Sequence, residues 1–351
     1  MTPQKLRFAL VGAGVIGTTH ARALAELPDV AELVAVVDRD PTRAQELADR
    51  YDAEATTDLD AVLRRDDIDA VTICTPSGVH ADGAVAALDA GKHVVVEKPI
   101  DITLAAADRI IDAEKRSGKT VAVISQHRFD KSSEKVLQAV RDGHLGTITS
   151  AIASHAWWRG QSYYDSGEWR GTLALDGGGA VMNQTVHTVN LLTTIVGTPV
   201  EVFAYTACLA HERIEVEDTA VAVVKFASGA LGMIHGTTAA YPGLDARLRV
   251  FGSKGSAVIS NDALTFLHEN AGDAPEIAMS EMTGLNQVTD EYALEPEDLP
   301  LGRAHRRQLA DFVEAVTTGR APRVGTEEAR TSLSVILAMY ESAATGRPVT
   351  L

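Results

Sequence analysis

The chain has 351 residues, of which 45% are hydrophobic and 23% charged, and its formal net charge is −16. This length suits two globular domains better than one. No apolar run reaches the roughly 18 residues that a membrane span needs, and no basic stripe could follow a nucleic-acid backbone. Membranes and nucleic acids are therefore not expected partners.

The first residues lack the basic, apolar and small-residue order of a signal peptide. The two cysteines, Cys74 and Cys208, have neither a disulfide framework nor metal-ligand spacing. We therefore expect a cytoplasmic protein without a metal.

Strand and helix patterns alternate through the first third of the chain. Apolar strands are predicted at residues 6–11, 32–38, 68–76, 93–99 and 120–125, and helices at 15–26, 41–50, 78–91 and 103–117. Apolar strands that alternate with helices indicate a parallel sheet covered on both faces. The sequence therefore predicts a doubly wound α/β domain over residues 1–125.

After residue 126 the pattern changes to strands joined by short turns. Hairpin-like pairs occur at residues 218–238 and 247–260, and helices are predicted at 132–143, 180–196, 304–318 and 326–344. We expect a second, α+β domain over residues 126–351 with a large, open and mostly antiparallel sheet. From Glu269 to Pro300 there are nine acidic residues and no basic one, which is typical of a solvated loop or flap.

The first strand leads into a glycine-rich turn that opens a helix. Its GxGxxG spacing comprises Gly12, Gly14, Val15, Ile16 and Gly17, and Asp38 ends the next strand. Such glycines permit a tight turn, close approach of a pyrophosphate and close helix packing, while the acidic residue accepts hydrogen bonds from ribose. We therefore predict a bound dinucleotide, NAD in preference to NADP, although Arg39 could meet a 2′-phosphate.

The segment GKHVVVEKPI places Glu97 and Lys98 directly after a buried strand. Ligands of open parallel sheets bind beyond the carboxyl ends of the strands, so both side chains are expected beside the cofactor. Lys98 could orient a substrate hydroxyl, stabilise an alkoxide or act as a base. The alternative is a lysine that merely faces solvent at a strand end.

The apolar helix 180–196 carries a polar stripe formed by Asn183, His187, Asn190 and Thr194. A polar stripe on a buried helix must face a partner or a cleft. His187 suits proton transfer near neutral pH, the alternative being a histidine satisfied within a core. The three glycines at 177–179 would admit other backbone or a cofactor.

The segment 155–172 is rich in aromatic and basic residues. Aromatic rings pack on the C–H surfaces of sugars, and arginines reach hydroxyls. We predict substrate contacts from Arg159, Tyr163, Trp169 and Arg170. The alternative is a lid or interface loop with aromatic anchors.

Four segments in chain order resemble the Gfo/Idh/MocA oxidoreductases, named for glucose–fructose oxidoreductase and inositol dehydrogenase. They are GAGVIG, CTPSGVHAD, GKHVVVEKPI and GGGAVMNQTVHTVNLL, and the C-terminal segment from Ala329 is similar as well. The resemblance implies a Rossmann domain, an α/β domain whose open sheet forms dimers or tetramers, and NAD(P)-dependent oxidation of a sugar or cyclitol hydroxyl. Many members have Asp where this chain has Asn183 and Asn190.

Carried over to this sequence, the resemblance makes Lys98 and His187 the catalytic residues and places Thr75, Pro76 and His80 along the cofactor. It implies a dehydrogenase that converts a ring hydroxyl of a sugar or related polyol to a ketone. The most similar subgroup oxidises C3 of a pyranose or a nucleotide-linked sugar. The substrate contacts would then include Lys98, Asn183 and His187. Inositol 2-dehydrogenation is one alternative, and a regulatory binder that senses NAD without turnover is another.

Overall fold

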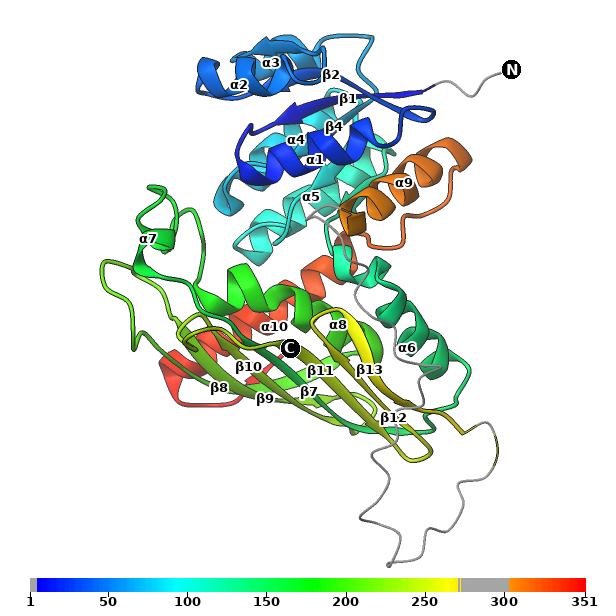
Figure 1. The fold of residues 1–351 in the computed structure, drawn as a ribbon, viewed down its shortest axis with the longest axis vertical. Helices are drawn as coiled ribbons and strands as arrows, with labels where there is room; N and C mark the ends of the chain where they lie inside the picture. Colours follow the sequence, from blue (N-terminus) through cyan, green and yellow to red (C-terminus); the bar gives the residue numbers. More distant parts are fainter. Residues whose placement is uncertain (1–4, 271, 273–302) are drawn as a thin grey trace, which may run out of the picture. The chain divides into compact units, whose positions relative to one another are not determined.

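The computed structural model describes residues 5–270, 272 and 303–351, so nearly all of the predicted acidic loop lies outside the described residues. The described residues form two compact units (Figure 1). The first comprises residues 5–126, 172–177 and 303–333, and the second comprises the others. The sequence-based division at residue 125 assigned residues 303–333 to the second domain. Within the described part, no helix is both long and apolar enough to cross a membrane.

The first unit is built around a six-stranded parallel sheet with strand order β3-β2-β1-β4-β5-β6. This order is that of a doubly wound Rossmann domain and confirms the predicted fold. Its elements are β1 (Leu6–Val11), α1 (Val15–Ala25), β2 (Ala31–Val37), α2 (Pro41–Ala48), β3 (Glu54–Thr56), α3 (Leu59–Leu63), β4 (Ala70–Ile73), η1 (Ser77–Val79), α4 (His80–Asp89), β5 (His93–Val96), α5 (Leu104–Ser117), β6 (Val121–Val123), α9 (Arg303–Thr318) and the start of α10 (Thr326–Thr345).

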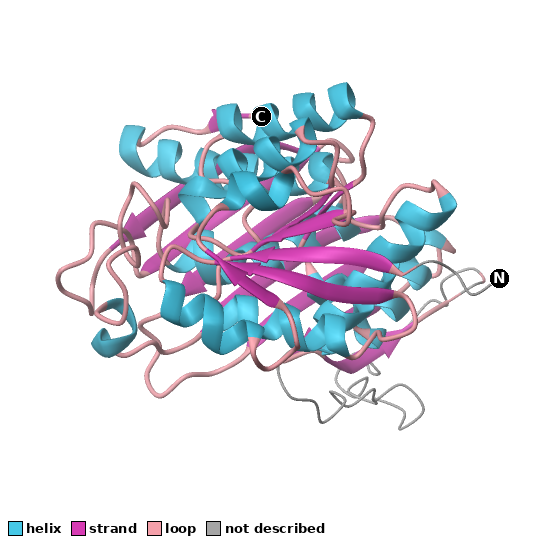
Figure 2. Ribbon diagram, turned by 90° about the horizontal axis from the view of Figure 1, so that it is seen from above, coloured by secondary structure: helices cyan, strands magenta, loops and turns pink. Residues whose placement is uncertain are grey.

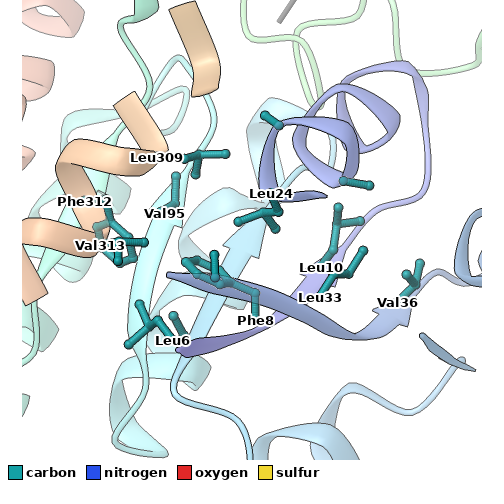
Figure 3. Packing of buried hydrophobic residues seen from close by; sticks show 14 of the residues in the cluster. Leu6, Phe8, Leu10, Leu24, Leu33, Val36, Val95, Leu309, Phe312 and Val313 are labelled. Carbon is teal, nitrogen blue, oxygen red and sulfur yellow. The ribbon is translucent and has the colours of Figure 1, made fainter. Parts of the chain in front are cut away.

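The apolar strands of this sheet pack under helices from both ends of the chain. Figure 3 shows Phe8 and Leu24 in one cluster with Leu309, Phe312 and Val313. The rings of Phe8 and Phe312 are 6.0 Å apart, and both residues are fully buried. Helix α9 therefore completes the core of the first unit beside α1, although nearly 280 residues separate the two helices.

The second unit contains an eight-stranded sheet with strand order β13-β12-β11-β7-β10-β9-β8-β14. All neighbouring strands are antiparallel except β7 and β10, which confirms the predicted mostly antiparallel sheet. Its elements are η2 (Gln126–Phe129), α6 (Lys131–Arg141), β7 (Ile148–Ala156), α7 (Gln161–Tyr164), η3 (Ala180–Thr185), α8 (Val186–Val196), β8 (Pro199–Ala207), β9 (Thr219–Phe226), β10 (Leu231–Thr237), β11 (Ala246–Gly252), β12 (Ser256–Ser260), β13 (Ala263–His268) and β14 (Val349–Thr350), with the end of α10.

Helices cover one face of this second sheet, as Figures 1 and 2 show. Helix α8 packs on β7 and β11, and α6 packs on β12 and β13. Side chains of β9 alternate between buried and exposed, as expected for strands with one covered face. On the other face, Val223, Leu231 and Met233 remain 56%, 58% and 37% exposed.

Candidate active site

The glycine-rich turn between β1 and α1 is shaped by close contacts of the backbone. Gly12 has φ +102°, and a Cβ there would lie 2.5 Å from the carbonyl oxygen of Cys74. A Cβ on Gly17 would lie 1.9 Å from the carbonyl oxygen of Gly12. Around Gly14, by contrast, a Cβ would meet no atom within 4 Å. Two glycines thus form the turn, and the third leaves its backbone accessible to a phosphate.

Other features of this turn also fit a dinucleotide. Gly14 is the N-cap of α1 and provides no side-chain cap, so the backbone N–H groups of the first turn face outward toward an anion. Val15 is 76% exposed. Within the described residues, the buried hydroxyl of Thr75 has no hydrogen-bond partner. An apolar contact and an unused hydroxyl are therefore available beside the turn.

Asp38, the predicted ribose ligand, lies at the carboxyl end of β2 and fastens the glycine turn. Its carboxylate accepts hydrogen bonds from the backbone N–H of Ala13 at 2.7 Å and of Asp40 at 2.9 Å. Arg39 is exposed beside it. The predicted acidic position and the glycine turn are therefore in direct contact.

Lys98 follows β5 and is half-buried, at the same edge of the sheet as the glycine turn. Its backbone N–H donates to Oε2 of Glu97 at 3.0 Å. Oε1 of Glu97 lies 2.9 Å from Nε2 of His20 and 3.5 Å from Nε2 of His305. Nδ1 of His20 in turn lies 2.8 Å from Oγ1 of Thr72. The backbone at Lys98 is thus anchored to a buried polar network.

This network holds its charges in the protein interior. Burial raises the pKa of Glu97, but the hydrogen bonds from His20 and His305 outweigh it and hold that pKa well below its usual value. Burial lowers the pKa of His20, and the neighbouring Cys74 and Glu97 raise it to about 10. Glu97 therefore acts as a buried structural anion between two imidazoles. The possible ligand atoms of Glu97, His20 and His305 lie within 4.8 Å of one another, but His20 in its protonated form offers no lone pair to a metal ion.

Sequence analysis placed Glu97 beside the cofactor, which stays a prediction, and missed His20 and His305, with which Glu97 interacts. His20 lies three residues beyond Gly17 on the buried face of α1, and a polar residue on an apolar helix face was the available signal. His305 comes from α9, which the sequence could not assign to this unit.

His80, predicted to line the cofactor, joins the two loops that follow β4 and β5. Its ring nitrogens lie 2.8 Å from the carbonyl oxygen of Pro99 and 2.9 Å from that of Thr75. The ring is buried, and burial lowers its pKa. Pro76 is the N-cap of η1 in the same loop. His80 thus braces the segment that carries Lys98.

The helix with the polar stripe begins as a π-helical turn, η3, and continues as α8. Buried Glu217 holds its start, because its carboxylate accepts hydrogen bonds from the N–H groups of Gly179 and Val181, both at 2.9 Å, and from the hydroxyl of Tyr340 at 3.1 Å. A Cβ on Gly179 would lie 1.7 Å from the carbonyl oxygen of Glu217, and one on Gly178 would lie 2.2 Å from the Tyr340 hydroxyl. These two glycines therefore admit parts of the protein itself.

Within the stripe, Asn183, His187 and Thr194 are half-buried and Asn190 is buried. The ring of His187 packs edge-on against that of His127, with centroids 4.9 Å apart and planes at 81°. Nδ1 of His127 lies 3.0 Å from Asp130 and 2.9 Å from Asp262. Burial lowers the pKa of His127, but these two carboxylates outweigh it and raise that pKa to about 10. A charged imidazole between two carboxylates thus supports His187, and sequence analysis missed it.

The aromatic segment 155–172 reaches the same helix. Nη2 of Arg159 donates to Oε1 of Gln184 at 3.0 Å, and Nε2 of Gln184 donates to Oδ1 of Asn183 at 2.9 Å and to the hydroxyl of Tyr163 at 3.2 Å. Arg170 stacks on Tyr163 and Trp169. Apart from His187, the second unit contains five predicted substrate contacts, and these interactions bring them together. They are Arg159, Tyr163, Trp169, Arg170 and Asn183.

A Rossmann sheet with a glycine turn, an acidic residue at the end of β2 and a lysine after β5 defines an NAD-binding oxidoreductase. The family model described as "Oxidoreductase family, NAD-binding Rossmann fold" matches residues 6–125, and the "GFO/IDH/MocA C-terminal domain" matches residues 133–258. The chain belongs to the Gfo/Idh/MocA oxidoreductase family, and NAD is the cofactor of its first unit.

Three similar proteins span nearly the whole chain. Myo-inositol 2-dehydrogenase of Thermotoga maritima is 30% identical over 362 residues, which cover 99% of this chain and 98% of the relative. The WlbA dehydrogenase of Bordetella pertussis, solved with NADH and UDP-GlcNAcA, is 32% identical with a TM-score of 0.86 and 99% coverage of both chains. Aldose-aldose oxidoreductase of Caulobacter crescentus, solved with glycerol, is 28% identical with a TM-score of 0.82, covering 99% of this chain and all of the other.

Proposed function

We propose that this protein is an NAD-dependent dehydrogenase that oxidises a ring hydroxyl of a sugar, at C3 of a pyranose, to a ketone. The observation that carries the proposal is the anchoring of Lys98, whose backbone is hydrogen-bonded to the buried carboxylate of Glu97 at the edge of the sheet that holds the glycine turn. Similarity to dehydrogenases solved with NADH and UDP-GlcNAcA or with glycerol supports this substrate class.

The proposed roles of the side chains follow from their chemistry. NAD⁺, when bound, supplies the hydride acceptor. The Lys98 ammonium holds the oxygen as it becomes an alkoxide, and such electrostatic stabilisation contributes about 3 kcal/mol in comparable sites. The His187 imidazole accepts the hydroxyl proton. Glycines 12, 14 and 17, Asp38 and Thr75 would hold the cofactor.

Inositol 2-dehydrogenation is the second candidate. It is favoured by the relatives from Thermotoga maritima and Rhizobium meliloti, which carry that activity in their names and are 30% and 31% identical to this chain. Asn183 and Asn190, in place of the aspartates that many members carry, favour the sugar. The two candidates differ in the ring that is oxidised, so a substrate panel separates them.

The test is NAD⁺ and NADP⁺ reduction by the purified protein with pyranoses, anhydrosugars and inositols. We expect turnover of a pyranose, a fall of about 100-fold or more in kcat for Lys98→Ala, and unchanged NAD⁺ binding. The control is Lys115→Ala, because Lys115 is exposed and paired with Glu327 at 3.6 Å. Tight NAD⁺ binding without turnover of any sugar or inositol would contradict the proposal and favour a regulatory binder.

We propose, in addition, that the open face of the eight-stranded sheet joins copies of this chain into a homo-oligomer. The face carries Tyr205, Val221, Val223, Leu231 and Met233, all exposed, and Val223 lies opposite both Met233 and Phe203 in the sheet register. An exposed apolar patch formed by adjacent strands typically marks an interface, and closed homo-oligomers bury the same patch on each copy.

A further inference from the structure

Two arginines of the second unit stack on one aromatic ring. The guanidinium carbon of Arg159 lies 5.2 Å from the ring centroid of Tyr163, and that of Arg170 lies 4.3 Å from it. Trp157 lies 5.0 Å from the Arg159 guanidinium and Trp169 lies 4.5 Å from that of Arg170. Both cations thereby lie within stacking distance of the Tyr163 ring, in a chain whose net charge is strongly negative.

Neither charge is neutralised within the described residues, where no carboxylate lies within 4.0 Å of either guanidinium. Asp165, on the same segment, pairs with Arg213 at 2.9 Å, and Glu168 is exposed. The buried Nε of Arg159 also finds no acceptor among the described atoms. One cation would be enough to stack on the Tyr163 ring, so stacking does not explain why two arginines are present. Two guanidiniums without carboxylate partners could instead bind an oxyanion.

The backbone of Arg159 is fixed on both sides. Its N–H donates to the carbonyl oxygen of Thr238 at 2.9 Å, and its own carbonyl oxygen lies 2.6 Å from Nε2 of His211. The other ring nitrogen of His211 lies 3.0 Å from the fully buried carboxylate of Asp218. A buried pair therefore fixes the position of this arginine before any ligand arrives, which lowers the ordering cost of binding.

The pair of arginines is also tied to the polar stripe. Gln184 connects the Arg159 guanidinium to Asn183, as described above, and Asn183 precedes His187 by about one helical turn. Only the Gln184 side chain would therefore separate an anion-binding Arg159 from the polar stripe that carries His187, the proposed proton acceptor.

We infer that the substrate carries an oxyanion, a carboxylate of a sugar acid or a phosphate ester, that Arg159 and Arg170 bind together. The inference rests on the proposed function, because it names the class of sugar that is oxidised. Guanidinium groups bind both kinds of oxyanion, since each presents two oxygens that can accept hydrogen bonds from paired N–H donors.

The experiment compares glucose, glucuronate and glucose 6-phosphate, and the nucleoside-diphosphate-linked forms of glucose and glucuronate, as substrates with NAD⁺. We expect kcat/KM for an anionic sugar to exceed that for glucose by about 10- to 100-fold, as one or two charge-assisted hydrogen bonds provide. Preference for glucuronate identifies a carboxylate, and preference for glucose 6-phosphate or for both linked sugars identifies a phosphate.

Arg159→Gln and Arg170→Gln are each expected to reduce this anionic preference by about 10-fold. Arg213→Gln is the matched control, because it removes an arginine of the same unit that already has a carboxylate partner. It is expected to leave the preference unchanged. The Arg159 backbone is hydrogen-bonded to Thr238 and His211, so the Arg159 variant could fail to fold. The Arg170 variant would then still test the inference. Circular dichroism checks the fold of each.

The outcomes separate this inference from the proposed function. Equal turnover of neutral and anionic sugars, or a preference that neither arginine variant alters, overturns the inference while the dehydrogenase stands. If no sugar is oxidised, tryptophan fluorescence provides the second readout, because Trp157 and Trp169 stack on the two arginines. If glucuronate or glucose 6-phosphate quenches the fluorescence saturably and both variants lose this quenching, the result supports the anion site without the dehydrogenase activity. If the wild type shows no such quenching, the inference is overturned.

Discussion

His127 stands between two carboxylates and against the ring of His187, so its charge state sets the local electrostatics of the stripe. With a pKa near 10, it remains an imidazolium throughout the physiological range. One positive charge then balances one of the two carboxylates, and the ring keeps a fixed orientation because Nδ1 faces both. His187 is thereby supported by a group that does not titrate near neutral pH.

Replacing His127 should change the pH dependence of stability. Because its folded pKa lies above the ordinary value of 6.5, the stability that it contributes is complete below about pH 6.5 and is lost as the pH rises through about 10. Urea unfolding should show His127→Gln well below the wild type at pH 7 and closer to it at pH 10. For the control His93→Gln, the difference should stay constant over this range, because the pKa of His93 is lowered to about 4, by burial and by the charge of Lys119.

Glu97 provides a second prediction, on stability alone. Glu97→Gln removes the charge that pairs with buried His20 and should lower the free energy of unfolding by about 3–5 kcal/mol, the usual effect of leaving one buried partner unpaired. Asp82→Asn breaks the surface pair with Arg109, whose side chains are 71% and 54% exposed, and should cost under about 1 kcal/mol. Equal losses in the two variants would show that the Glu97 network is not electrostatically coupled.

At the scale of elements, the turn that precedes η3 depends on glycine for steric reasons. Gly179→Ala would place Cβ against the Glu217 carbonyl and should destabilise the protein by about 3 kcal/mol or more, since neither backbone can move away without breaking the hydrogen bonds at the start of the helix.

Gly160→Ala is the control for this turn. Gly160 has φ −69°, and the atom nearest to a new Cβ, Oγ of Ser162, would be at 3.6 Å, so the substitution should change the midpoint of urea unfolding little. A wild-type midpoint for Gly179→Ala would mean that the contact with Glu217 is absent in solution.

Most elements were predictable because their patterns are local. The strands 219–226 and 231–237 flank a short glycine-containing turn, and β1, β2, β4 and β5 are apolar runs bounded by turns. Strand β3 was missed because three residues, Glu54–Thr56, form no apolar run. The π-helical turn of η3 was also unpredictable, because Glu217, which holds it, lies 36 residues or more away from the groups it binds.

The predicted site residues share a further property. Gly12, Asp38, Lys98 and His187 are each marked by a motif or a stripe, whereas His20, His127, Gln184 and His305 gain their significance only from partners brought near by folding. Spacing in the sequence reveals a residue that a motif requires. It does not reveal the residues that hold it in place, because long-range contacts leave no local pattern.

At the scale of the whole molecule, the open sheet is the proposed interface between copies of the chain. Val223→Lys would place a charge among apolar neighbours on the exposed face and should shift the proposed oligomer toward monomer in light scattering after size-exclusion chromatography. Glu32→Lys is the control, since Glu32 is an exposed strand residue of the first unit. An unchanged mass for the Val223 variant would contradict the proposed interface.

The packing of α9 against β1 also dictates an order of events during synthesis. Phe8, Leu10 and Leu24 leave the ribosome early, but Leu309 and Phe312, which cover them, follow only after about 300 more residues. The nascent first domain consequently has an uncovered apolar face while strands β7 to β13 of the second sheet are being translated. A chaperone that binds apolar surfaces would have prolonged access to this chain at that face.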